Sequence, residues 1–165
     1  EAGRTVIKSV ITAIGIALVL ITVVLLVLLG SVRDAVLVLA PILLAALLTA
    51  ASTVMIGIPL NFANIIVVPL LLGLGVASSI HFVSRQREEG INGIVLATST
   101  PRAVLYSTLT TIASFGTLGL SSHAGTASMG ILLTISISMT LICTLLVLPA
   151  LMAVAYAPRG GKVAA

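Results

Sequence analysis

The sequence has very little charge for its length. Only eight Lys and Arg and four Asp and Glu occur in 165 residues, whereas about a quarter of the residues of an ordinary globular domain are charged. No charged residue occurs from Ala35 to Ser84 or from Ala103 to Pro158. A soluble chain of this size could not cover so much apolar surface, with 59% hydrophobic residues. The composition therefore indicates an integral membrane protein and excludes a soluble domain.

Aromatic residues and cysteine are also scarce, and each absence excludes a class of function. Tryptophan is missing, and no basic stripe with interleaved aromatics accompanies the net charge of +4, so a nucleic-acid partner is not expected. The single Cys143 excludes an intrachain disulfide. No nucleophile–base set, metal cluster or P-loop is present, so we expect no enzyme activity, no catalytic residue, no metal and no cofactor. The string GLGVAS follows no strand and is not a dinucleotide site.

What the sequence does contain is long apolar runs. A helix needs about 20 apolar residues to cross the hydrocarbon core of a bilayer. The pattern predicts an all-α bundle of five transmembrane helices over residues 10–29, 35–55, 61–83, 101–120 and 126–156. We expect Asp34 to cap the second helix, Pro41 to kink it, and Thr100 with Pro101 to open the fourth.

The segments outside these helices complete the predicted organisation. Residues 85–99 are polar but carry apolar positions at helical spacing, which predicts a short interfacial helix. Residues 1–9 are expected to link the bundle to an upstream domain, because no signal peptide opens the chain. Residues 158–165 are expected to form a cytoplasmic tail.

Basic residues predict the orientation of the bundle in the membrane. With the N-terminal end outside, the inner connections and the tail contain six basic residues and the outside only Arg4 and Lys8; the six are Arg33, Arg85, Arg87, Arg102, Arg159 and Lys162. The positive-inside rule therefore favours an outer N-terminal end and a cytoplasmic C-terminus. An outer start without a signal predicts that this is the C-terminal piece of a larger protein.

Polar side chains on two predicted helices are the candidates for function. On the fourth helix, hydroxyl residues recur at helical spacing and form one stripe: Ser107, Thr110, Thr111, Ser114, Thr117 and Ser121. On the third helix, Asn61, Asn64, Ser78 and Ser79 share one quarter of the circumference. Because polar groups avoid lipid, these stripes should face protein or a wet cavity.

Each candidate also has a purely structural interpretation. Ser and Thr in membrane helices often bond only their own i−4 carbonyl, and small residues such as Gly130 and Thr134 let helices pack closely. Asn61 could serve as a helix cap. His81 lies one turn from Arg85 and could either titrate near neutral pH or lie at the interface without a role in transport. These alternatives remain open for Asn64 and His81, which are weaker candidates than the hydroxyl residues.

The order of these features resembles the second half of a resistance–nodulation–division (RND) transporter. The similarity is carried by a Gly-x-Gly-Val turn that leads to IHF and RQREE, and then by STPRAV, STLTTIASFG, SSHAGTASMG and LPAL. These elements cover most of residues 58–152 and are most similar to the MMPL-like lipid exporters. SSHAGTASMG is similar to the hopanoid-transporter group of that branch.

The resemblance implies helices 8–12 of a twelve-helix, multi-pass transporter of the bacterial inner membrane, with residues 1–9 following a periplasmic domain. Such proteins use the proton gradient to move lipids or other hydrophobic compounds towards the periplasm. The partners would be the N-terminal transmembrane half and the periplasmic domains of the same protein, together with a lipid substrate. A homo-oligomer is compatible with this interpretation.

The sequence departs from the family pattern at one position. Relatives often carry an Asp just after the Gly-x-Gly-Val turn, where this chain reads Ala77-Ser78-Ser79. The resemblance then implies that the acid of a proton relay lies in the other half, with Ser78, Ser79, Thr110 and Thr111 as hydrogen-bonding partners. The alternative is a sterol-sensing-like module that binds lipid, regulates a partner and transports nothing.

Overall fold

The computed structural model describes residues 2–58, 67–89 and 95–156, and nearly all of these are helical. The helices are α1 (Ala2–Leu29), α2 (Val32–Ile56), α4 (Val67–Glu89), α5 (Thr100–Leu118), α6 (Ala124–Ile142) and α7 (Leu148–Ala155). A single 3₁₀ turn, η1 (Val95–Ala97), precedes α5, and a π-helical turn, η2 (Cys143–Val147), joins α6 to α7. The described part of the chain contains no strand, so the predicted all-α class is confirmed.

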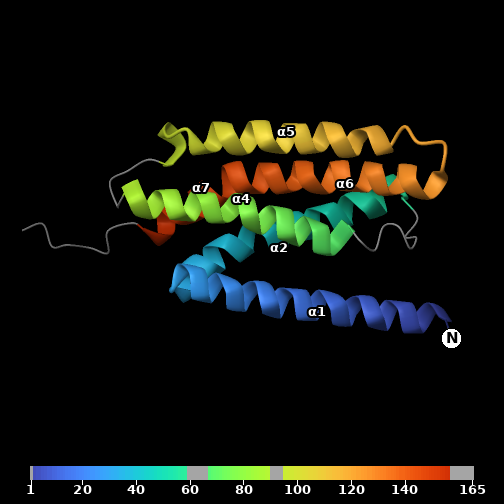
Figure 1. Cartoon of the computed structure of the whole chain (residues 1–165), viewed down its shortest axis with the longest axis horizontal. Coiled ribbons are helices and arrows are strands. Elements are labelled where there is room, and N and C mark those ends of the chain that lie inside the picture. Colours follow the sequence, from blue (N-terminus) through green and yellow to red (C-terminus); the bar gives the residue numbers. More distant parts are fainter. Residues whose placement is uncertain (1, 59–66, 90–94, 157–165) are drawn as a thin grey trace, which may run out of the picture.

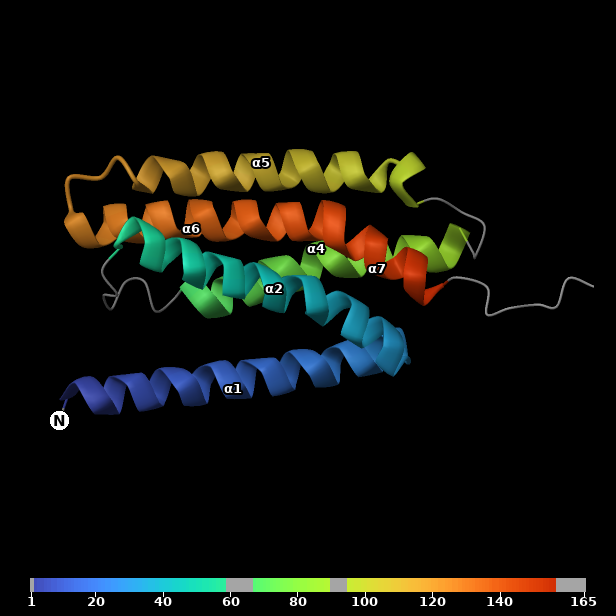
Figure 2. The same cartoon turned by 180° about the vertical axis from the view of Figure 1, so that it is seen from behind.

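The helices run roughly antiparallel along one common direction (Figures 1 and 2). α2 lies in the middle and packs on α4, α6 and the η2–α7 segment, while α5 packs mainly along α6 at one edge. α1 lies at the opposite edge and diverges from the bundle towards its N-terminal end (Figure 1). The bundle therefore has two outer helices and a compact centre made of α2, α4 and α6.

Side-chain burial agrees with a lipid environment for the outside of the bundle. One core cluster joins α1, α2, α4 and α7 around Val38, Ile42, Phe82 and Leu148. By contrast, the described side chains of α1 are mostly exposed, and only Leu25 and Leu29 are buried. Four helical stretches are long and apolar enough to cross a membrane: Ile11–Leu29, Val32–Ile56, Val67–Glu89 and Ala124–Ala155. α5 is not one of them, because its hydroxyl residues lower its hydropathy.

Close backbone approach holds α5, α6 and α4 together. A Cβ atom on Gly130 would lie 2.5 Å from the backbone nitrogen of Gly119, and one on Gly75 would lie 3.1 Å from side-chain carbons of Ile42 and Thr140. Apolar burial drives little association between helices in lipid, so contacts through small residues and van der Waals packing replace it. The predicted packing role of Gly130 and Thr134 is consistent with this geometry, since Thr134 lies against Gly116.

Several predicted boundaries and caps differ from the structure. α2 begins at Val32 after Ser31, so the predicted Asp34 cap is wrong and Asp34 lies inside the first turn. Likewise, α5 begins at Thr100 itself, after Ser99. α2 continues through Pro41 without interruption.

The predicted interfacial helix over 85–99 is also revised. α4 extends to Glu89 because Arg85 forms ion pairs with Glu88 and Glu89 at the i+3 and i+4 positions, which support a helix. Among the described residues between α4 and α5, η1 forms the one helical turn. Asn61 and Asn64 lie outside the described residues.

Candidate functional site

A cleft of about 530 Å³ lies between α4 and α5, and α6 with η2 forms its floor. It extends along α4 from Leu71 to Glu88. Eighteen residues of helix, with a rise of about 1.5 Å between neighbours, span about 25 Å. Leu71, Val104 and Ile137 contribute apolar walls, while most of the other side chains carry hydroxyl groups. The cleft therefore crosses most of the bundle, and hydroxyl groups recur along its largely apolar walls.

Three of the predicted hydroxyl residues come together in this cleft. Ser78 lies on the α4 wall, and Ser107 and Thr111 lie on the α5 wall. The i, i+4 spacing of Ser107 and Thr111 places them on one face of α5, as the sequence pattern predicted. The structure thus brings part of each predicted stripe to a single site.

The other candidates of the hydroxyl stripe do not line the cleft. Thr110 and Ser114 are exposed on α5 outside the cleft lining. Thr110 donates to the carbonyl of Tyr106 at 2.9 Å, and Ser114 donates to the carbonyl of Thr110 at 2.9 Å. Thr111 donates in the same way to Ser107 at 2.9 Å. These bonds match the structural interpretation, although each hydroxyl oxygen retains lone pairs that can accept a further hydrogen bond.

Ser79 faces away from the cleft. It is fully buried, and its hydroxyl has no hydrogen-bond partner among the described residues. The hydroxyls of Ser136 on α6 and Thr144 on η2 share this condition. An unpaired buried hydroxyl costs about 1–3 kcal/mol, so each of the three lowers the stability of the bundle unless water reaches it. The prediction that Ser78 and Ser79 act on one face is not supported, because adjacent helical residues point about 100° apart.

Thr144 is the residue that the sequence-based analysis missed. It is 1% exposed, it lies in the π-helical turn, and it lines the cleft together with Thr140 one turn earlier. The sequence contained two signals for this site, the i, i+4 spacing of Thr140 and Thr144 and the proline at position 149. A proline lacks the N–H that continues α-helical hydrogen bonding, so a local departure from the α-helix was to be expected nearby. π-turns inside helices occur frequently at functional sites.

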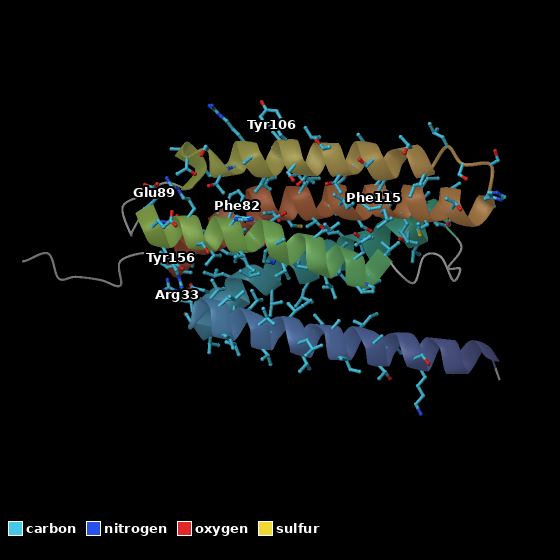
Figure 3. All side chains as sticks on the ribbon, viewed as in Figure 1. Arg33, Phe82, Glu89, Tyr106, Phe115 and Tyr156 are labelled. Atoms are coloured by element: carbon cyan, nitrogen blue, oxygen red, sulfur yellow. The ribbon has the colours of Figure 1, made fainter. Side chains whose placement is uncertain are left out.

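His81 and an ion cluster lie at one end of the cleft. His81 lines the α4 wall one turn before Arg85, and Arg85 and Glu88 line the same end. Arg85 pairs with Glu88 at 2.7 Å and with Glu89 at 2.8 Å. Figure 3 shows that the labelled residues Arg33, Glu89 and Tyr156 lie at this end, which we call the charged end of the bundle.

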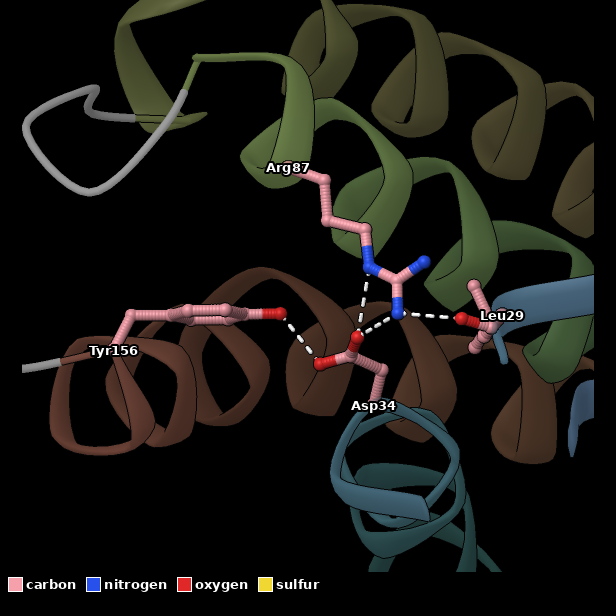
Figure 4. A network of polar contacts seen from close by, with 4 residues as sticks. All are labelled: Leu29, Asp34, Arg87 and Tyr156. Atoms are coloured by element: carbon pink, nitrogen blue, oxygen red, sulfur yellow. Dashed lines mark hydrogen bonds and ion pairs between the residues drawn. The ribbon is translucent and has the colours of Figure 1, made fainter. Parts of the chain in front are cut away.

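A second polar network lies at the charged end and connects residues from distant parts of the chain (Figure 4). Asp34 is 3% exposed, and its carboxylate accepts a hydrogen bond from Arg87 Nε at 2.7 Å and a second from Arg87 Nη2. Nη2 also donates to the carbonyl of Leu29 at 2.6 Å, and the Tyr156 hydroxyl donates to Asp34 at 2.5 Å. The network therefore joins the α1–α2 turn to the ends of α4 and α7.

Tyr156 is positioned from both sides in this network. The Arg33 guanidinium lies 4.2 Å from the centre of its ring, a cation–π contact. Burial, together with the bond to Asp34, raises the pKa of the Tyr156 phenol above its ordinary value. The phenol therefore keeps its proton at neutral pH and can donate it to the carboxylate.

No group of three metal-ligating side chains occurs within the described ranges. The cleft offers hydroxyls, one imidazole and one ion cluster, which can bind water or a small polar group.

Comparison with known proteins relates this arrangement to a family. The sequence pattern of the MMPL family matches residues 4–161. The chain is 45% identical over 152 residues to the hopanoid transporter HpnN of Rhodopseudomonas palustris, and 40% identical over 152 residues to HpnN of Burkholderia multivorans. These alignments cover 92% of this chain but only 17% of each relative.

A more distant relative extends the same comparison. The putative membrane protein MJ1562 of Methanocaldococcus jannaschii is 31% identical over 121 residues, which are 69% of this chain and 31% of that protein. The resemblance to RND transporters predicted from the motifs is thereby confirmed. Since the family pattern spans nearly the whole chain, this multi-pass membrane protein belongs to the MMPL family.

Proposed function

We propose that the chain is the C-terminal transmembrane part of an RND-type exporter of the bacterial inner membrane. Its substrates would be lipids or other hydrophobic compounds, with hopanoids as the first candidate, moved towards the periplasm and outer membrane. The observation that carries the proposal is the 45% identity, over 92% of this chain, to a protein named as a hopanoid transporter. The two HpnN relatives are named as transporters, which argues against an enzyme.

The proton gradient is the proposed source of energy. Ser78, Ser107 and Thr111 would supply hydrogen-bonding groups along the cleft, and a carboxylate on the N-terminal half would complete the relay. A mid-membrane Asp costs about 2.5–3.5 kcal/mol on insertion scales, so a carboxylate there is usually retained for a function. The absence of an acid near Ser78 supports the proposal that this carboxylate lies on the other half.

Lipid analysis of separated inner and outer membranes tests the export proposal. Cells that lack the parent protein should accumulate one lipid class in the inner membrane, and the intact protein should restore its distribution. An uncoupler should reproduce the accumulation if export uses the proton gradient. An unchanged lipid distribution in the deletion strain would contradict export.

The lack of an acid near Ser78 also keeps a second candidate open, a lipid-binding module that regulates a partner. Such a module has no need of the proton gradient, so an uncoupler should leave its output unchanged. An Asp or Glu in the fourth helix of the other half would favour the exporter.

A further inference from the structure

Arg33 is exposed at the charged end and has no acidic partner among the described residues. The three described carboxylates, which include the neighbouring Asp34, are all paired with Arg85 or Arg87. Asp34 is buried, so its charge is directed into the bundle while that of Arg33 stays outside. A guanidinium carries five N–H donors in a planar fork. The donors of Arg33 are therefore available to an anion that approaches from outside the bundle.

The ring of Tyr156 holds this guanidinium in place. Its centre lies 4.2 Å from Arg33 Cζ, and the ring is itself positioned because the Tyr156 hydroxyl donates to Asp34 at 2.5 Å. A cation that lies over an aromatic face is held without the use of its N–H donors. Arginine binds phosphate through two parallel hydrogen bonds, and a guanidinium already fixed in position loses less entropy when it forms them.

An exposed apolar stripe on α2 begins beside Arg33. Val36, Leu43 and Leu47 are 55%, 49% and 67% exposed, and their spacing places them on the same side of the helix as Arg33. From position 33 to position 47 an α-helix rises about 21 Å. One leaflet contributes about half of the 30 Å hydrocarbon core, so the stripe is long enough for a whole acyl chain. A fixed cation at one end of such a stripe matches the chemistry of a phospholipid.

We propose that Arg33 and this stripe bind an anionic phospholipid of the leaflet at the charged end, with its phosphate on the guanidinium and an acyl chain along α2. Positive charge selects an anionic headgroup over a zwitterionic one. Arg159 and Lys162 follow Tyr156 within six positions of the sequence and add to the positive charge of this segment. The bound phospholipid is a resident of the bundle and not an exported substrate, so the inference does not depend on the proposed function.

Photo-crosslinking in the full-length parent protein tests the site. The photoreactive residue p-benzoylphenylalanine replaces Val36, one turn from Arg33, or Val54 as the control position. Val54 is 82% exposed near the other end of α2. The protein is placed in vesicles of phosphatidylethanolamine with a minority of phosphatidylglycerol. After illumination, mass spectrometry identifies the lipids captured at each position.

Phosphatidylglycerol captured at position 36 should exceed its share of the vesicle lipid by about fivefold, the effect of about one basic side chain near a membrane surface. Capture at position 54 should follow the vesicle composition. Arg33→Gln should abolish the enrichment at position 36. Arg102→Gln should preserve it, because Arg102 is exposed at the same end on α5 but has no ring contact among the described residues.

Two tyrosine variants separate the ring from the hydroxyl. Tyr156→Phe and Tyr156→Leu both lose the bond to Asp34, but only Tyr156→Phe keeps the ring beneath Arg33. The enrichment should persist in Tyr156→Phe and fall in Tyr156→Leu. Total lipid capture at position 54 reports whether each variant is still folded and inserted.

Four results would overturn the proposal. Capture at position 36 that follows the vesicle composition would show no selective lipid. An equal loss in Arg33→Gln and Arg102→Gln would show only the general attraction of a positive membrane end. Crosslinks from position 36 to the N-terminal half, in place of lipid, would show that protein covers the stripe. Loss of the enrichment on addition of inorganic phosphate would show a site for a free anion. None of these results measures lipid export, so the proposed function is tested separately.

Discussion

Asp34 shows how a single buried charge organises the charged end of the bundle. A buried carboxylate is stable only when it is paired and hydrogen-bonded, and Asp34 receives bonds from both Arg87 and Tyr156. These residues come from segments far apart in the sequence, so the network fixes the relative positions of α2, α4 and α7. The charged end therefore holds these three helices together.

The first prediction concerns this ion pair. Arg87→Gln leaves the Asp34 carboxylate buried without its partner, and we expect the variant to lose on the order of 2 kcal/mol of stability, less than the 3–5 kcal/mol of a fully buried pair because Arg87 is partly exposed. Thermal unfolding of the purified full-length protein in detergent measures the change.

The double variant Asp34→Asn with Arg87→Gln is the control for this prediction. It removes both charges, so it should recover part of the lost stability. If the double variant were as unstable as the sum of the single variants, the charges would not interact as described.

A second prediction uses the Tyr156 hydroxyl. Tyr156→Phe preserves the ring beneath Arg33 but removes the bond to Asp34, which should cost about 1.5–3 kcal/mol as for other hydrogen bonds to charged groups. The same unfolding measurement applies. An unchanged stability would mean that water replaces the phenol at Asp34.

Thr144 gives a third prediction that separates a wet cleft from a dry one. Thr144→Val has nearly the same shape without the hydroxyl. In a dry cleft it removes an unsatisfied polar group and should raise the stability by about 1–3 kcal/mol. In a hydrated cleft we expect no gain, because water already satisfies the hydroxyl. Thr49→Val is the comparison, since Thr49 donates to the carbonyl of Ala45 within its own helix.

At the scale of helices, the tightest contact is the α5–α6 pair at Gly130. A Cβ at this position would lie 2.5 Å from the Gly119 nitrogen and 2.7 Å from the Leu118 carbonyl carbon, and these backbone atoms cannot rotate away. Gly130→Ala should therefore push α5 from α6 and cost about 1–3 kcal/mol, as overpacking usually does.

Gly125→Ala is the matched control in the same helix. Its added Cβ would meet nothing within 4 Å, so we expect a neutral effect or a small gain from helix propensity. Both variants are compared by thermal unfolding in detergent. Similar effects at the two positions would contradict the close approach of α5 and α6.

The helices themselves were largely predictable because their apolar runs have the length of a membrane span. The end of α4 was missed because charged residues suggested a surface segment, although the spacing of Arg85, Glu88 and Glu89 already favours a continued helix. The π-turn at Cys143–Val147 has no reliable local signal beyond Pro149. Such features depend on tertiary packing rather than on periodicity.

The candidate site was predictable to the extent that helical geometry alone determines it. The spacing of Ser107 and Thr111 placed both on one face, and that face lines the cleft. The cap assigned to Asp34 was wrong because the residue that captures its carboxylate, Arg87, lies 53 positions away in the sequence. Thr144 became visible only when α4, α5 and α6 were placed together.

For the whole molecule, the charged end decides how the bundle sits in the membrane. Arg33, Arg85 and Arg87 gather at this end, while the short α5–α6 connection at the opposite end has no Lys or Arg. The positive-inside rule then predicts that the charged end faces the cytoplasm. Because α1, α2, α4, α5 and the continuous α6–η2–α7 segment each run from one end to the other, one orientation fixes the sides on which their ends lie.

Thiol labelling from the two sides of the membrane tests this orientation. In the cysteine-free full-length protein, Ser122→Cys in the α5–α6 connection should react with an impermeant reagent added to spheroplasts. Arg33→Cys, at the charged end, should react only in inside-out vesicles. The reverse pattern would place the charged end on the outer side and contradict the predicted orientation.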